Sequence, residues 1–431
     1  MSAELRKQNP SWTQPLGLKM SKTGSICSTA SNLKKLILRH PDLAHVATYD
    51  EFADRLLVNR PISRGSRGPW PRVWEDRDTA DLLVRLDEDL EIDSVSLEAL
   101  DRAVDQVGRE PGNRQNEIAS ELRSLAARQR RRKRETTAFA DLLDALHVPQ
   151  GGVELSMLRR WFTGAAARAL EPGVKFDSML ILIGGQRCGK SRFCAQLVES
   201  IASPRYYSDI SANVSTKEAP IAMRDCWIWE WAELDQLSGP TVERVKAFLS
   251  TRVDEYREPY GRRTIQIPRH TAIIGTTNER DFLRDLTGSR RFWIVETCRE
   301  GAKTFKRISR ETIREAWGQA ALDAQEWLSG PRSNLPPWVM SAEEEEACAR
   351  IARKSTVEDP WIDALNAKLE TLSVQEARWG IPTEDLYLLL GLQKADRTLS
   401  AAQRLGRAMN ALGWRRCGQP CRGNSRYVKT E

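Results

Sequence analysis

Long apolar runs are missing from this sequence of 431 residues. A helix that crosses a bilayer needs about 20 consecutive apolar residues, and no segment of the chain comes close to that length. The opening stretch "MSAELRKQNPSW" also lacks the apolar core of a secretory signal peptide. We therefore expect a cytoplasmic protein with no membrane among its partners.

Cysteine and histidine are scarce as well. The chain has eight cysteines and four histidines, and they are scattered. A disulfide framework is not expected at this size and density. Cys417 and Cys421 are close neighbours, but no second cysteine pair or histidine pair lies beside them, which disfavours a zinc site.

Basic residues are in excess, with a net charge of +7. Two runs concentrate them, "ARQRRRKRE" at residues 127–135 and "WRRCGQPCRGNSRYVK" at residues 414–429. Such runs are often solvated faces, but an uneven positive excess also favours a polyanionic partner. Because the two runs lie on either side of a glycine-rich motif at residues 184–191, they point to nucleic acid.

Hydrophobic periodicity divides the chain into three parts. Residues 1–150 are mostly helical by pattern and form an N-terminal accessory, oligomerisation or DNA-binding region. Residues 151–330 alternate short apolar runs with helical segments, which predicts an α/β domain with a parallel sheet. Residues 331–431 hold a proline-rich linker, then two helices and a small hairpin, an order typical of a winged helix.

Short apolar runs mark the strands of the middle part. Four strand candidates cover residues 178–184, 226–232, 271–278 and 291–297. The first and third show little alternation, as expected of central strands that are covered on both faces. Residues 253–268 predict a hairpin with its turn near residues 259–261.

The stretch "GGQRCGKS" fits the phosphate-binding pattern G-x-x-x-x-G-K-[ST]. It has the required context, because a buried strand precedes it and an amphipathic helix follows. Lys190 would place its charge on the β- and γ-phosphates of ATP, and Ser191 would place its hydroxyl on Mg²⁺. Arg187 either adds a phosphate contact or crowds the loop. The residues predicted to contact the nucleotide are Gly184, Gly185, Gln186, Arg187, Cys188, Gly189, Lys190 and Ser191.

The stretch "DCWIWEWAELD" at residues 225–235 predicts a strand that delivers a carboxylate to the metal. Alternation puts Trp227, Trp229 and Trp231 on one face, packed against a covering helix, and Glu230 on the other. Stacking on nucleic-acid bases is the alternative role for the tryptophans. Glu230 lies near the carboxyl end of the strand, where α/β folds bind ligands, and is the expected partner of Mg²⁺. Glu233 could activate the attacking water, although the division of roles between the two glutamates stays open.

Two further polar positions follow in sequence. Asn278 ends the third strand candidate and could hold the lytic water near the γ-phosphate. Arg290 and Arg291 precede the fourth strand candidate, where either guanidinium could serve a neighbouring subunit's nucleotide as an arginine finger. Surface ion pairs are the alternative role for each arginine.

With these motifs in this order, residues 155–325 resemble the virulence-associated protein E family of phages and phage satellites, which is related to superfamily 3 helicases of the AAA+ group. The segments that carry the resemblance are "LILIGGQRCGKS", "DCWIWEWAELDQL", "VKAFLSTRVDEYREPYGRRTIQIPRHTAIIGTTN" and "DFLRDLTGSRRFW". The resemblance implies catalytic roles for Lys190, Glu230, Glu233, Asn278 and one of the two arginines. It also implies DNA contacts in a ring channel for Lys246, Tyr256, Tyr260, Arg262 and Arg263.

These observations predict an AAA+-like ATPase core with a parallel sheet, flanked by a mostly helical N-terminal region and a winged-helix-like C-terminal domain. By resemblance, the function is that of an ATP- and Mg²⁺-dependent DNA helicase or replication initiator, acting as a homo-hexamer in the host bacterium's cytoplasm. The C-terminal region, with Arg415, Arg416, Arg422 and Arg426, could bind duplex or origin DNA. The alternatives are an AAA+ ATPase that remodels or loads a partner, a P-loop kinase, and a nucleotide-switched DNA-binding regulator. Residues 1–150 show no paired-acid primase signature, so priming is not expected.

Overall fold

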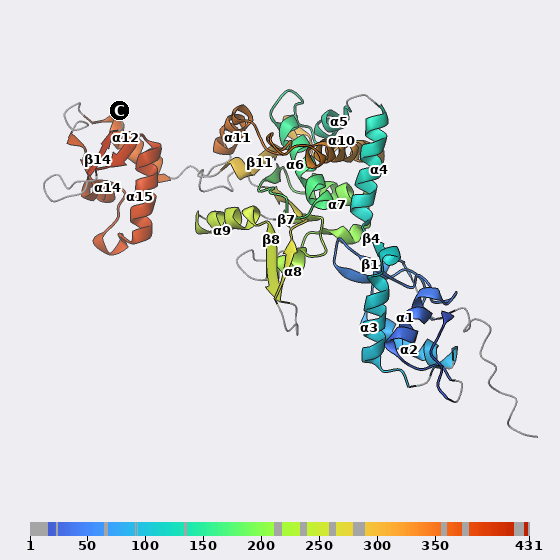
Figure 1. Cartoon of the computed structure of the whole chain (residues 1–431). Helices are drawn as coiled ribbons and strands as arrows, with labels where there is room; N and C mark the ends of the chain where they lie inside the picture. Colours follow the sequence, from blue (N-terminus) through green and yellow to red (C-terminus); the bar gives the residue numbers. More distant parts are fainter. Residues whose placement is uncertain are drawn as a thin grey trace, which may run out of the picture. The chain divides into compact units, whose positions relative to one another are not determined.

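The computed structural model describes residues 16–22, 25–63, 68–90, 92, 94–132, 136–210, 218–232, 239–257, 264–278, 289–354, 360–372, 379–417 and 426–429. Contacts between residues divide the chain into two compact units, Met1–Ser355 and Thr356–Glu431. Figure 1 shows the elements of both units. No described helix has the length and apolar content needed to cross a membrane.

The first unit begins with a small module of helices around a short sheet, drawn in blue in Figure 1. The strands pair in the order β3-β2-β1-β4, and one buried hydrophobic cluster belongs to this module alone. Its elements are α1 (Ala30–Arg39), β1 (Ala47–Asp50), β2 (Arg55–Val58), β3 (Arg72–Val73), α2 (Asp76–Glu88), α3 (Leu97–Gly108), η2 (Pro111–Asn113) and β4 (Arg114–Gln115). The prediction of a mostly helical region missed this sheet, whose strands have only two to four residues.

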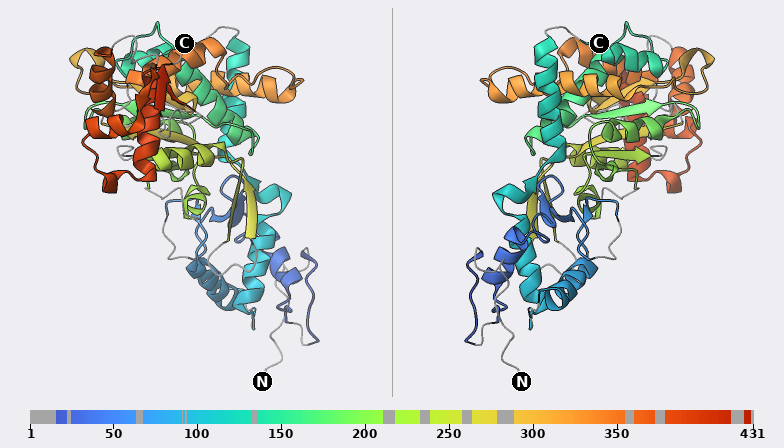
Figure 2. Two further views of the ribbon diagram at one scale, coloured as in Figure 1. Left: turned by 90° about the vertical axis from the view of Figure 1, so that its left-hand side faces the viewer. Right: turned by 90° about the vertical axis from the view of Figure 1, so that its right-hand side faces the viewer.

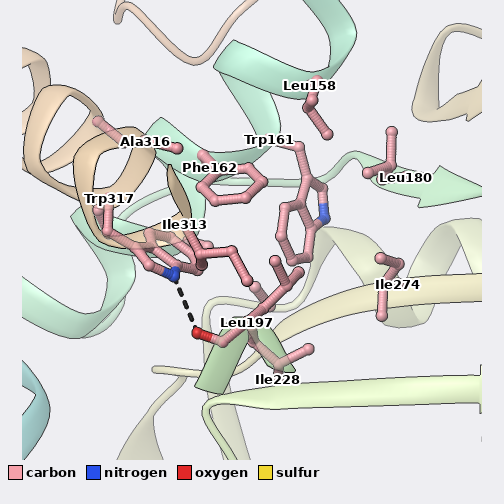
Figure 3. Packing of buried hydrophobic residues seen from close by; sticks show 14 of the residues in the cluster. Leu158, Trp161, Phe162, Leu180, Leu197, Ile228, Ile274, Ile313, Ala316 and Trp317 are labelled. Atoms are coloured by element: carbon pink, nitrogen blue, oxygen red, sulfur yellow. Dashed lines mark hydrogen bonds between the residues drawn. The ribbon is translucent and has the colours of Figure 1, made fainter. Parts of the chain in front are cut away.

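Four helices then form one face of the main core: α4 (Glu117–Arg132), α5 (Ala138–Ala145), α6 (Glu154–Leu170) and α10 (Arg310–Ser329). Residues of α4 and α5 share a buried cluster with α6, α10 and the central sheet, so the segment before residue 150 packs as part of that core. Figure 3 shows Trp161 and Phe162 of α6 packed with Trp317 of α10, whose indole Nε1 donates to the carbonyl of Leu197 at 2.9 Å.

The described part of the predicted basic run, residues 127–132, lies at the end of α4, where several of its arginines are paired with α10. Arg128 lies 2.9 Å from Glu311, and Arg132 donates to Glu315. Exposed pairs of this kind contribute little stability, typically below about 1 kcal/mol each. They do reduce the positive charge that this helix offers to nucleic acid.

The central sheet is parallel and has the strand order β11-β5-β10-β7-β6. Its strands are β5 (Met179–Ile183), β6 (Tyr207–Ser208), β7 (Ile228–Ala232), β10 (Ala272–Thr277) and β11 (Phe292–Glu296). Helices α7 (Lys190–Glu199), α8 (Glu218–Met223) and α9 (Gly239–Ser250) and the 3₁₀ turn η3 (Pro204–Tyr206) lie between them in sequence. Every residue of β5 and β10 is buried, as predicted for central strands. Because the strands are parallel, the carboxyl ends of β5, β10 and β7 meet at one edge.

The tryptophans of β7 divide between the two faces of the sheet. Trp229 and Trp231 stack with ring centroids 5.6 Å apart, and Trp229 meets Phe248 of α9 edge-on at 6.2 Å. Trp227 precedes the strand and turns to the opposite side, where its ring lies 4.4 Å from Trp317. The prediction that all three share one face is therefore wrong for Trp227. Packing against a covering helix is correct for Trp229, whose side chain is fully buried.

The predicted hairpin is present as β8 (Val253–Arg257) and β9 (Thr264–Pro268), which pair antiparallel. Figures 1 and 2 show it in yellow, projecting away from the sheet. Its base is fixed by Arg269, which is 1% exposed and donates through Nε to Asp254 at 2.9 Å. The predicted turn lies outside the described residues.

Two short turns, η5 (Ser289–Arg291) and η6 (Arg299–Gly301), flank β11. Helix α11 (Ala342–Lys354) follows α10 and packs on β11 and η5, so the first unit extends to Ser355. The prediction of a boundary at residues 330–331, which rested on the proline-rich stretch before this helix, therefore differs from the structure.

The second unit has its own hydrophobic cluster. Its elements are α12 (Pro360–Glu370), β12 (Ile381–Pro382), α14 (Thr383–Leu389), η7 (Lys394–Asp396), α15 (Leu399–Ala411), β13 (Trp414–Arg416) and β14 (Arg426–Lys429). The strands form an antiparallel sheet in the order β12-β14-β13. The predicted two helices and hairpin are α14, α15 and β13–β14, and the structure adds α12 and β12.

Candidate nucleotide site at the carboxyl edge of the central sheet

The loop of residues 184–189 joins β5 to α7 at the carboxyl edge of the sheet. Gly184 is in close contact with Thr297 and Cys188, and a Cβ atom there would collide with the Thr297 hydroxyl. Gly189 has a φ of +113°, a left-handed conformation that a side chain would strain. Arg187 is also left-handed, with φ +64°, and its side chain is exposed rather than packed into the loop. The glycines therefore permit the tight turn that starts α7.

Lys190, the first residue of α7, connects the loop of residues 184–189 to the carboxyl end of β10. Its ammonium Nζ donates to the carbonyl oxygens of Gly184 at 2.8 Å and Gly185 at 3.1 Å. It also donates to Oδ1 of Asn278 at 2.9 Å, just beyond β10. The structure thus brings together two residues that are 88 positions apart in sequence. A fixed positive charge at a helix N-terminus favours an anion such as a phosphate.

Glu230 is fully buried in β7 and accepts hydrogen bonds from three hydroxyl groups. Ser191 Oγ and Thr276 Oγ1 each donate to Oε1 at 2.7 Å. The hydroxyl of Tyr207 donates to Oε2. A buried carboxylate needs such donors, because burial without them is costly. Burial and the hydrogen bond to Glu230 raise the pKa of Tyr207 above its usual range, so its hydroxyl stays protonated and remains a donor.

The sequence motifs missed Tyr207 and Thr276. Thr276 lies two residues before Asn278 in "TTN", so the alternation of β10 carries the signal that it faces the site. Tyr207 lies in a two-residue strand at the edge of the sheet, which pairs in parallel with the start of β7. Nothing in its local sequence marks that position.

The donor set at this edge suits magnesium. Ser191 Oγ and the Glu230 carboxylate are hard oxygen ligands within hydrogen-bonding distance of each other. Mg²⁺ is typically held by one or two such protein groups together with substrate phosphates and water. The described residues contain no group of three or more His, Cys, Asp or Glu side chains that could hold a metal alone. The protein would therefore supply part of the coordination.

Arg290 and Arg291 lie at the amino ends of the strands, opposite the carboxyl ends where the loop of residues 184–189 begins. They precede β11, whose first residue pairs with Met179 at the start of β5. The length of β5, at about 3.3 Å per residue, separates these arginines from the loop of their own chain by roughly 16 Å. Arg291 Nε lies 3.5 Å from Asp177. Arg290 has an exposed side chain, and its carbonyl accepts from an indole in β11.

The predicted DNA-contacting residues have a different setting. Lys246 on α9 is 5% exposed and Tyr256 on β8 is 2% exposed. Side chains buried in the fold offer almost no surface for phosphates or bases, so this placement contradicts direct DNA contact at both positions. The predicted contacts Tyr260, Arg262 and Arg263 lie outside the described residues, as does the catalytic candidate Glu233.

Residues 122–357 match the virulence-associated protein E-like domain. That match covers more than half of the chain. The chain belongs to the virulence-associated protein E-like family. The resemblance read from the motifs is thereby confirmed, and the matched range includes the loop, Glu230, Asn278 and both arginines.

Two solved structures are similar over much of the chain. The apo structure of the NrS-1 C-terminal region (305–718) has a TM-score of 0.42 at 12% identity, covering 89% of this chain and 96% of that chain. The X-ray structure of JCV helicase has a TM-score of 0.24 at 11% identity, covering 66% of this chain and 80% of that chain. No curated protein matches the sequence.

Proposed function

We propose that this member of the virulence-associated protein E-like family is an ATPase that acts on DNA in the replication of a phage or mobile genetic element. The observation that carries the proposal is the meeting of Lys190, Ser191, Glu230 and Asn278 at the ends of three neighbouring parallel strands. These residues come from three separate motifs. A charge for phosphates, two metal ligands and a polar group for water are the parts that ATP hydrolysis requires.

In this proposal the loop of residues 184–189 is a phosphate-binding loop that opens an AAA+-like core. Lys190 orients the β- and γ-phosphates, and its charge stabilises the negative charge that develops during transfer. Ser191 and Glu230 hold Mg²⁺, which when bound neutralises charge on the same phosphates. Asn278 orients the attacking water. Glu233 is the second acid of the motif and a candidate to activate that water.

The position of the arginines supports a subunit arrangement in which one chain completes the site of the next. The backbone at Arg290 lies about one length of β5, roughly 16 Å, from the loop of its own chain, and its exposed side chain is in a position to face a neighbour's nucleotide. Arg290 is the better candidate because Arg291 is close enough to Asp177 for an ion pair. A homo-hexameric ring, in which DNA passes through the channel, is the assembly that we propose from the family.

The second unit is proposed as a winged-helix DNA-binding domain. Its order is helix, strand, two helices and two strands, with the last two strands paired antiparallel as a wing. Arg415 and Arg416 on β13 are exposed and could contact phosphates of duplex or origin DNA. Arg426 is half-buried and donates to the carbonyl of Trp379, and Arg422 lies outside the described residues.

ATP hydrolysis by the purified full chain, with and without DNA, tests the ATPase. We expect Mg²⁺-dependent turnover that Lys190→Ala lowers by at least about 100-fold. Arg187→Ala, at an exposed side chain of the same loop, tests separately whether Arg187 adds the phosphate contact that the sequence left open. Absence of turnover in the wild-type chain under all DNA conditions would overturn the proposal.

A strand-displacement assay on forked DNA separates helicase from the main alternative. ATP-dependent unwinding that Lys190→Ala abolishes supports translocation on DNA. Two of the five predicted DNA contacts, Lys246 and Tyr256, are buried. The main alternative is an AAA+ ATPase that loads or remodels a partner. Robust hydrolysis without unwinding on any fork would select that alternative.

A further inference from the structure

Tyr207 contacts the proposed metal-binding carboxylate from an element that no motif marks. Its hydroxyl donates to Oε2 of Glu230, whereas Ser191 and Thr276 donate to Oε1. Each oxygen of the Glu230 carboxylate is thus held by different donors, Oε1 by Ser191 and Thr276 and Oε2 by Tyr207. Groups that orient a metal-binding carboxylate without touching the metal commonly change affinity or activity by 10–100-fold when removed.

The residues just before Tyr207 are bound to the N-terminal module. Asp50, the last residue of β1, accepts from the hydroxyl of Tyr206 at 2.9 Å and from Nη2 of Arg205 at 3.1 Å. The other oxygen of Asp50 accepts backbone N–H groups of Phe52 and Ala53 at 3.0 and 3.3 Å. The carboxylate of Asp50 therefore connects the turn after β1 to the turn before β6.

Burial makes this connection rigid. Asp50 is fully buried, and Phe52 is 3% exposed with its ring edge-on to Tyr206 at a centroid distance of 5.4 Å. Burial raises the pKa of Asp50, which Arg205 opposes, so the carboxylate depends on its partners to stay ionised. On the far side of the same segment, Glu117 of α4 accepts the backbone N–H of Ser203 at 2.9 Å.

Backbone hydrogen bonds fix residues 206 and 207 against the start of β7. The carbonyl of Tyr206 accepts from the N–H of Trp227 at 2.7 Å, and Tyr207 pairs with Ile228, two residues before Glu230. A shift of the segment at residues 203–206 would move Tyr207 relative to Glu230. No other described contact is needed to link the module to the carboxylate.

We propose that Tyr207 is a positioning residue for Glu230, and that Asp50 of the N-terminal module sets Tyr207 through Arg205 and Tyr206. Docking of the N-terminal module thereby controls how well the site holds Mg²⁺ for hydrolysis. The inference rests on the proposed ATPase activity. It assigns the module a regulatory contact with the site.

The Tyr207→Phe variant of the full chain tests the first step, because it removes one hydroxyl and keeps the ring. We expect about a 10-fold lower kcat with little change in KM for ATP. Independently of turnover, titration of Mg²⁺ into the variant with a non-hydrolysable ATP analogue should show about 10-fold weaker Mg²⁺ binding in calorimetry. Tyr49→Phe is the matched control, because Tyr49 also donates to a carboxylate, that of Asp54, without touching the segment of residues 203–207. An unchanged kcat and Mg²⁺ dependence in Tyr207→Phe, with the wild type active, would overturn this inference and leave the ATPase proposal intact.

A double-mutant cycle tests the link to the module. Asp50→Asn removes the charge that holds Arg205 and should lower kcat several-fold, also with a raised Mg²⁺ requirement. If both residues act through one path, the double variant with Tyr207→Phe will be about as slow as Tyr207→Phe alone. Effects that multiply would show independent action and overturn the coupling. Circular dichroism melts of each variant identify loss of folding, and the Mg²⁺ dependence of Asp50→Asn remains a test if Tyr207→Phe is unstable.

Discussion

At the residue scale, the candidate site consists of a few side chains, and the roles proposed for them rest on their hydrogen-bond partners. The glycine-lysine motif, Glu230 and Asn278 could be found from the sequence because each belongs to a spaced pattern next to a strand. Their grouping in space follows from the parallel sheet. Tyr207 could not be found, because its role depends on the edge pairing of a two-residue strand.

Glu230→Gln should separate nucleotide binding from turnover. The amide keeps the shape but removes the charge that Mg²⁺ needs, and it turns one acceptor into a donor that faces hydroxyl groups. We expect ATP binding within a few-fold of wild type and kcat lowered by about 100-fold or more. Equilibrium binding of a fluorescent ATP analogue and steady-state hydrolysis measure the two effects.

Glu233→Gln is the comparison that divides the roles of the two acids. If Glu233 activates water, Glu233→Gln will keep the wild-type affinity for Mg²⁺ and ATP and lose only turnover, whereas Glu230→Gln will also bind Mg²⁺ more weakly. Wild-type turnover in Glu230→Gln would contradict the assignment of Glu230 as a metal ligand.

His270 should make the fold sensitive to acid. Its Nε2 lies 2.8 Å from the carbonyl of Arg224 and its ring lies 4.2 Å from Phe52. Burial lowers the pKa of His270 from its ordinary 6.5 to about 4, although the hydrogen bond to the Arg224 carbonyl and the charges of Asp254 and Asp225 oppose this change. The unfolded chain therefore binds the proton more tightly between these pH values. The contribution of about 3 kcal/mol is present above pH 6.5 and is lost as pH falls toward 4.

Urea unfolding of the full chain at pH 7 and at pH 4.5 measures this effect. We expect His270→Gln to lose less stability over that interval than the wild type, because glutamine has no proton to bind. The amide N–H of glutamine can still donate to the Arg224 carbonyl. An equal loss in both proteins would show that other groups cause the acid sensitivity.

At the element scale, length and burial decided what the sequence could predict. The strands β5, β7, β10 and β11 were predicted from apolar runs of five or more residues, and the hairpin from its alternation. The sheet of the N-terminal module escaped because its short strands carry little periodicity. Trp227 shows the limit of alternation, since the rule holds only from the residue at which strand pairing begins.

Helix α6 should not tolerate a methyl group at Gly164. A Cβ there would lie 2.5 Å from the ring of Phe176, which is 3% exposed. Alanine is the better helix former by about 1 kcal/mol, but overpacking of a closed core typically costs 1–3 kcal/mol. We expect Gly164→Ala to lower the melting temperature of the first unit's transition in calorimetry.

Gly406 in α15 is the matched control. A Cβ there would meet the Tyr427 hydroxyl at 3.5 Å, an ordinary contact. Gly406→Ala should therefore keep or raise the melting temperature of the second unit. A stabilising effect of Gly164→Ala would mean that Phe176 can move aside.

At the scale of the whole molecule, the sequence predicted the parallel sheet of the core better than the borders of the unit that contains it. Helices α4 and α5 share the buried cluster of the core, and α11 packs on β11, so the first unit continues on both sides of residues 151–330. Periodicity cannot show which core a helix joins. A proline-rich stretch before α11 resembled a domain linker although the helix beyond it folds back.

The proposal that a neighbouring subunit completes the site predicts complementation between two inactive variants. Arg290→Ala should lower kcat by about 1,000-fold, as for other arginine fingers, with ATP binding retained. Lys190→Ala is also inactive, but its Arg290 can serve the intact loop of an Arg290→Ala subunit. An equal mixture should regain about a quarter of the wild-type rate if sites act independently in a randomly mixed ring.

Arg291→Ala provides the control for this experiment. Because Arg291 lies near Asp177, Arg291→Ala should lower the stability slightly. Its kcat should stay close to that of the wild type, and mixing with Lys190→Ala should not raise it. An inactive mixture, or full activity in Arg290→Ala alone, would contradict a shared site.

The turn after β1 limits where recombination between members of this family can join two chains and still give a well-packed protein. The family match begins at residue 122, so recombination at that boundary would replace Asp50 and Phe52 while keeping Tyr206 and Arg205. The recombinant chain would lack the ring of Phe52 that packs on Tyr206, and the half-buried guanidinium of Arg205 would lose the carboxylate of Asp50. We expect the N-terminal module and the turn before β6 to be inherited together, because each supplies the specific partners of the other. Asp50 and Arg205, which form one of these contacts, are 155 residues apart in the chain.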